Sequence, residues 1–152
     1  MTGNSRIEGL SAARLIERLD LAPHPEGGWF RETWRTAAPE GQRAGATAIL
    51  FLLDAGESSH WHRVDADEVW FWQAGGALEL RLAASEAQSP RSMRLGPDLA
   101  GADGAQGIVP AGHWQAARPL DGWVLASCVV SPGFEFSGFE LAAPGWSPGR
   151  GD

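Results

Sequence analysis

Short segments with a period of two, separated by turn residues, dominate this chain from Trp29 onwards. In Ala77–Leu82, for example, three leucines alternate with Glu79 and Arg81. Such alternation places apolar side chains on one face of a β-strand. Many short strands with almost no helix predict an all-β sandwich or small barrel.

One segment, Ser11–Asp20, has helical rather than strand spacing. Ser11 suits the N-cap of a helix, and Pro23 prevents the helix from continuing. The pattern therefore predicts one short N-terminal helix. The predicted strands are 29–35, 47–53, 68–73, 77–82, 92–95, 107–109, 123–131 and 134–141.

The length of 152 residues fits one domain, 1–152, with a core at about 11–146 and a loose tail at 147–152. The net charge of -7, with no lysine, argues against a nucleic-acid or anionic-membrane surface. We find no secretion signal and no apolar run of membrane-spanning length. Cys128 is the single cysteine, so an intramolecular disulfide is excluded. We therefore expect a cytoplasmic protein.

Three polar side chains indicate a functional site. On an extended chain His60 and His62 point the same way, and Glu68 on the next strand faces them. Two imidazoles and a carboxylate suit a divalent transition metal such as Fe, Mn, Ni or Zn. Asp67 could face inward in place of Glu68. Alternatively, the His-x-His pair could be an exposed pair that arose by chance and has no functional role.

An apolar pocket is expected around these residues. Trp70 and Trp72 share the parity of Glu68, so all three are predicted to face one cavity. Glu32 and His113 are further candidates for its wall, although Glu32 on an edge strand also suits a surface salt bridge.

The segment from Gly56 to Gly75 resembles the first motif of the cupin superfamily. That motif has a glycine, His-x-His, a glutamate, and a second glycine seven residues later. Four positions match it: His60, His62, Glu68 and Gly75. Two spacings differ, because Gly56 lies closer to His60 and the interval from His62 to Glu68 is one residue longer.

A second cupin motif is similar to the segment that begins at Gly104 and continues through Pro110-Ala111-Gly112. Gln115 occupies the position of the motif's histidine, and His113 comes two residues early. The resemblance implies that Gln115 completes the metal shell of His60, His62 and Glu68, or hydrogen-bonds to it.

Four blocks resemble a narrower group of small cupins with an HPEGG-type signature, over about residues 15–146. The resemblance implies an RmlC-like jelly-roll barrel, a homodimer, and a small-molecule pocket inside the barrel. The blocks are His24–Thr33, Asp67–Trp70, Val109–Gly112 and Ser131–Phe134.

Three functions fit these observations. The leading hypothesis is a cupin that binds a small organic molecule in its barrel. In one version of this hypothesis the protein is a metal-dependent enzyme, and His60, His62 and Glu68 are the catalytic candidates. The second is a metal-free epimerase or isomerase of sugar nucleotides, with a histidine as general base. Such epimerases need a tyrosine proton donor, and the chain has no tyrosine. The third is a non-catalytic binding module. In the functional readings the histidines are predicted to face a solvated pocket.

Overall fold

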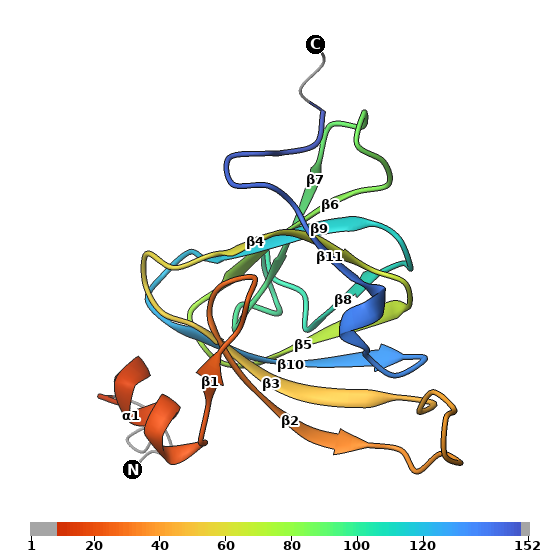
Figure 1. Ribbon diagram of the computed structural model, residues 1–152. Coiled ribbons are helices and arrows are strands. Elements are labelled where there is room, and N and C mark those ends of the chain that lie inside the picture. The colour runs from red at the N-terminus through yellow and green to blue at the C-terminus, as the bar shows by residue number, and fades with distance from the viewer. Residues whose placement is uncertain (1–8, 150–152) are drawn as a thin grey trace.

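The described part of the chain, residues 9–149, forms two antiparallel β-sheets that face each other in a computed structural model (Figure 1). The six-stranded sheet has the order β1-β2-β3-β10-β5-β8, and the five-stranded sheet the order β11-β4-β9-β6-β7. Strand pairing within residues 9–149 gives these two sheets and not one closed barrel. The strands are β1 Ala22–Pro23, β2 Trp29–Arg35, β3 Thr47–Leu53, β4 Ser59–Val64, β5 Asp67–Gly75, β6 Leu78–Ala83, β7 Arg91–Leu95, β8 Gln106–Val109, β9 Trp114–Pro119, β10 Val124–Ser131 and β11 Phe139–Leu141.

The predicted N-terminal helix is confirmed as α1, Ala12–Arg18. The Ser11 side chain accepts a hydrogen bond from the Arg14 backbone N–H at 3.2 Å, which satisfies one of the free donors of the first turn. Leu15 packs with Leu52 of β3, so the helix covers one end of the six-stranded sheet on its outer face. No helix within residues 9–149 is long and apolar enough to cross a membrane.

The main core lies between the two sheets. Leu78, Leu80 and Leu82 of β6 are each 0% exposed, as their alternation predicts. Burial of one such side chain contributes about 1.5–3 kcal/mol. The remaining core residues come from both sheets: Phe51, Leu53, Trp70, Leu95, Val109, Ala117, Val124, Ala126 and Cys128.

Two segments differ from the predicted pattern. β9 lacks the alternation of a half-exposed strand because its first four residues are all buried, so it escaped prediction. The predicted strand at 134–141 is instead a 3-10 turn, Phe136–Gly138, followed by the short β11. A Cβ at Gly138 would meet the Asp65 carboxylate, so the chain turns tightly there against another loop.

The tail predicted to be loose at 147–152 extends beyond the described residues from 150 onwards. Its described part makes ordered contacts. The Gly149 N–H donates to the Glu86 carbonyl oxygen at 2.8 Å, and the preceding Trp146 packs on Trp114 with ring centroids 4.6 Å apart.

Candidate functional site

A cavity of about 30 Å³ lies between the sheets, at the end where β5 begins and β10 ends. This space holds about one or two water-sized groups. A few polar side chains project into walls that are otherwise apolar, which is typical of a ligand site. The lining residues are His24, Glu26, Phe30, Thr47, Ile49, His62, Val64, Glu68, Cys128, Val130, Phe134 and Phe139.

Glu26 reaches the cavity from a turn rather than from a strand. The His24 N–H donates to the Gly28 carbonyl at 2.9 Å, and the Gly27 N–H donates to the His24 carbonyl at 3.0 Å. Gly27 has φ +109°, and a Cβ there would meet the Ser58 carbonyl oxygen. Only glycine fits this close passage. The turn therefore fixes Glu26 in the interior, where it is 8% exposed.

Glu26 and His62 form a buried ion pair. His62 Nε2 lies 2.9 Å from Glu26 Oε2, and His62 Nδ1 lies 2.7 Å from the His60 carbonyl oxygen. Because both ring nitrogens face acceptors, the imidazole carries both protons. The Ser59 hydroxyl also donates to Glu26 Oε2.

The pKa values of the pair support this charge assignment. Burial alone would lower the pKa of His62, but the charge and hydrogen bond of Glu26 raise it above its ordinary value. Burial alone would raise the pKa of Glu26, but the charge and hydrogen bond of His62 hold it below its ordinary value. Both directions favour the charged pair, with His62 as the cation and Glu26 as the anion.

A bulge in β4 separates His60 from His62. β4 pairs with β9 at Ser59↔Ala117 and at His62↔Gln115, so three steps along β4 match two along β9. The extra residue brings Ser59 and His62 to the same inward face. His60 points outward, and its Nε2 lies 2.9 Å from the Ala143 carbonyl oxygen.

Glu68 faces the cavity from β5 and is held by a chain of hydrogen bonds. Gln115 Nε2 donates to Glu68 Oε1 at 2.9 Å, and Trp70 Nε1 donates to Gln115 Oε1 at 3.0 Å. Burial raises the pKa of Glu68, against the opposing effects of His62 and Gln115. Asp67 points outward, where its Oδ1 accepts the Ala111 N–H at 2.8 Å. Glu68 is thus the inward carboxylate of the two.

His24 and Cys128 complete the titratable groups of the cavity. Burial lowers the pKa of His24, whose Nδ1 accepts the Glu26 backbone N–H at 3.1 Å. Its ring packs edge-on against Phe30 and Phe139, with centroids 4.5 and 5.9 Å away. Burial also raises the pKa of the Cys128 thiol well above its ordinary value, so the thiol stays protonated.

With this geometry established, comparison with known proteins identifies the family. The family described as Cupin superfamily (DUF985) matches residues 13–142. The chain belongs to this family. The recognition made from the two sequence motifs and the predicted jelly-roll fold are both confirmed.

This cupin is also similar in fold to several solved structures. Protein SO0799 from Shewanella oneidensis is 38% identical, with 88% of this chain and 85% of that chain covered and a TM-score of 0.81. A hypothetical protein from Leishmania major is 32% identical, with 88% of each chain covered and a TM-score of 0.79. Oxalate decarboxylase from Bacillus subtilis, at 16% identity over 81% of this chain and 30% of its own, has a TM-score of 0.60 and supports the fold alone. No curated protein matches this cupin.

The structure brings together only part of the predicted site. His62 and Glu68 line the cavity, while Gln115 and Trp70 hold Glu68 from behind. His60 is excluded by the β4 bulge.

The other three predicted pocket residues lie elsewhere. Glu32 pairs with Arg35 at 2.7 Å on the exposed edge of β2, and His113 lies in the turn before β9, away from the cavity lining. Trp72 shares the parity of Glu68 but is four residues along β5, about 13 Å away.

Sequence reasoning did not identify Glu26, His24, Ser59 or Cys128 as site residues. The HPEGG segment contained the signal, because its two glycines permit a turn tight enough to bury a carboxylate. The length of that turn gave no indication of the direction in which Glu26 points.

The predicted metal ligands do not fit a metal in this arrangement. His60 points outward, both nitrogens of His62 face hydrogen-bond acceptors, and both polar ends of Gln115 are engaged. Within residues 9–149 no three His, Cys, Asp or Glu side chains are arranged to hold a metal ion.

Proposed function

We propose that this cupin binds a compact organic molecule in the cavity between its sheets and moves a proton on it. One observation carries the proposal: His24, Glu26, His62 and Glu68 are all buried and all line the same small cavity. Buried titratable groups whose pKa values are shifted in opposite directions are characteristic of acid–base sites. A core built only for stability would not need four of them.

Glu68 is the proton-transfer group in this proposal. Burial makes its carboxylate a stronger base than an exposed one, and the Gln115 amide and the Cys128 thiol, both hydrogen-bonded to it, fix its orientation. The Glu68 carboxylate takes a proton from a carbon next to a carbonyl group, and the resulting acid later returns it.

His62 supplies a fixed positive charge. Both of its N–H groups are already donated, to Glu26 and to the His60 carbonyl, so its contribution to a bound molecule is electrostatic. A cation in a site of low dielectric stabilises the enolate that forms when the carbon loses its proton. Glu26 keeps His62 in the charged form.

The charges and the walls define the ligand class. Glu26 and His62 neutralise each other, and the walls contain Phe30, Phe134 and Phe139. Such walls suit a neutral hydroxy-carbonyl compound better than an anion, and the lining side chains must move apart to admit one of a few carbon atoms, because the cavity of about 30 Å³ holds only about one or two water-sized groups. This proposal is a restricted form of the isomerase hypothesis. It keeps the proton transfer next to a carbonyl group and does not require a tyrosine as proton donor.

Hydrogen–deuterium exchange tests the proposal. Hydroxyacetone incubated with the protein in D₂O should lose its proton signals next to the carbonyl faster than in buffer. Glu68→Gln should reduce this catalysed rate by about 100-fold or more, since general acid–base groups contribute about 10²–10⁴. Glu140→Gln, which alters an exposed carboxylate paired with Arg63, is the matched control and should exchange like the wild type. Equal rates for Glu68→Gln and the wild type would refute the assignment.

Metal-dependent binding, the other form of the leading hypothesis, requires His62 to give up one of its two hydrogen bonds. Elemental analysis of protein purified without a His-tag tests it directly. Stoichiometric Fe, Mn, Ni or Zn that is lost in His62→Gln would favour the metal-dependent form over proton transfer by Glu68 alone.

A further inference from the structure

A second and larger cleft, of about 510 Å³, opens at the other end of β5. It is lined by Trp72 and Trp123 together with the glycines of the turn between β5 and β6. The cleft residues Trp72 and Gly75 lie four and seven positions after Glu68 on β5, about 13 and 23 Å along the strand. The cleft is therefore independent of the cavity discussed above.

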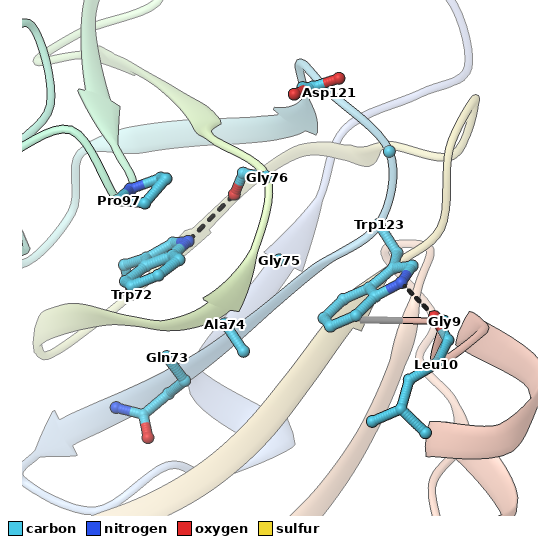
Figure 2. A pocket seen from close by; sticks show the side chains of 11 residues that line it. Gly9, Leu10, Trp72, Gln73, Ala74, Gly75, Gly76, Pro97, Asp121 and Trp123 are labelled. Carbon is cyan, nitrogen blue, oxygen red and sulfur yellow. Dashed lines mark hydrogen bonds between the residues drawn. The ribbon is translucent and has the colours of Figure 1, made fainter. Parts of the chain in front are cut away.

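Two half-buried tryptophans form the apolar walls, and both are fixed in orientation. Trp72 Nε1 donates to the Gly76 carbonyl at 2.9 Å, and Trp123 Nε1 donates to the Leu10 carbonyl at 2.9 Å. With both indole N–H groups engaged by backbone, a ligand meets those parts of the rings that are not packed against the protein. Figure 2 shows the two rings on either side of the chain at Ala74 and Gly75, so they form two separate platforms and not an enclosed cage.

The backbone between the platforms packs closely against the segment 121–123, which fixes the floor of the cleft. Gly75 has φ +92°, and a Cβ there would collide with Trp123, while a Cβ at Gly76 would collide with the Asp121 backbone. The β5–β10 register also shifts at this point, between Leu125 and Ala126. Bulges next to binding sites commonly redirect side chains.

The polar groups of the cleft select the kind of ligand. Gln73 and Asp121 are exposed at its rim and offer an amide and a carboxylate. Among its described lining residues there is no Lys, Arg or His, and the whole chain has a net charge of -7. Phosphate and carboxylate ligands are therefore disfavoured.

We propose that this cleft binds a neutral oligosaccharide of at least two rings. The apolar C–H faces of a sugar ring pack on an indole face, and its hydroxyl groups hydrogen-bond to carboxylate and amide side chains. Two fixed platforms that do not touch each other suit a ligand that spans both. A compact cation, in contrast, is best held where aromatic rings converge around it.

Saturation-transfer NMR with cellobiose, maltose and lactose tests the proposal, with glucuronate and tetramethylammonium as competitors. At least one disaccharide should receive saturation, and neither charged compound should displace it. Trp123→Ala and Asp121→Asn should each weaken its binding about tenfold or more. Trp34→Ala, which removes a tryptophan that is 52% exposed on β2, is the matched control and should bind like the wild type.

Asp121→Asn and Gln73→Ala alter exposed side chains, so they keep the test valid if Trp123→Ala fails to fold. The proposal is overturned if no disaccharide binds, if tetramethylammonium displaces the sugar, or if Trp34→Ala weakens binding as much as the cleft variants. Loss of proton exchange in Glu68→Gln has no bearing on this result, because the two sites are separate.

Discussion

At the scale of single residues, the Glu26–His62 ion pair places two charges in the buried interior, with Glu26 8% and His62 2% exposed. Removing a charge from water costs several kcal/mol, and attraction to the partner offsets this only if the remaining polar atoms are also satisfied. Here they are, because Ser59 donates to Glu26 and the His60 carbonyl accepts from His62. Removal of either partner would therefore leave the other as a buried charge without a counter-ion.

His62→Gln is expected to reduce the free energy of unfolding by about 3 kcal/mol, because it leaves the Glu26 carboxylate buried without its counter-ion. The sequence predicted a histidine facing a solvated pocket, but His62 is 2% exposed. Urea unfolding of the variant measures the loss. His113→Gln, in a turn away from the cavity, should change stability by less than about 0.5 kcal/mol. A loss below about 1 kcal/mol for His62→Gln would contradict the ion pair.

The pH dependence of that loss has a defined sign. The raised pKa of His62 gives stability that is full below its ordinary value of 6.5 and disappears as pH rises through the folded value. The lowered pKa of Glu26 gives stability that is present above its ordinary value of 4.5 and disappears as pH falls through the folded value. The difference between wild type and His62→Gln should therefore be largest between pH 4.5 and 6.5. A difference that stays constant from pH 5 to pH 9 would exclude this explanation.

At the scale of elements, the turn at 24–28 directs the Glu26 carboxylate into the interior, in addition to the Glu68 carboxylate that β5 places there. Gly27→Ala is expected to cost about 3 kcal/mol, because it combines an unfavourable φ with a clash against the Ser58 carbonyl. Gly112→Ala, at φ +79° with no atom within 4 Å of the new Cβ, should cost only about 1 kcal/mol. Thermal unfolding of both variants measures the difference, and equal losses would show that the turn tolerates a side chain.

Elements that follow their period were predictable, and the functional site lies where the period breaks. The leucines of β6 alternate without interruption, and their burial follows from the sequence. The β4 bulge places His60 and His62 on opposite faces of the strand, and no residue pattern in the sequence predicts it. Glu68 was predictable as a candidate because its own strand is regular there, whereas Glu26 depends on a turn that long-range packing against Ser58 and Ser59 defines.

At the scale of the molecule, the outer face of the six-stranded sheet is apolar beyond the part that α1 covers. Val129 of β10 pairs with Val69 of β5, which pairs with Ile108 of β8. Val129 and Val69 are half-buried, and Ile108 is 61% exposed. A row of aliphatic side chains across three strands is costly to leave in water and is a suitable centre for an interface.

We predict that a second copy of the chain covers this face. Light scattering should then give about 32 kDa at micromolar concentration, twice the chain mass of 16.2 kDa. Ile108→Glu places a charge in the centre of the interface and should shift the mass to that of one chain. Leu99→Glu alters a loop side chain that is also 61% exposed and should leave the dimer intact. A wild-type mass near 16.2 kDa, or dissociation by both variants alike, would exclude this face as the dimer contact.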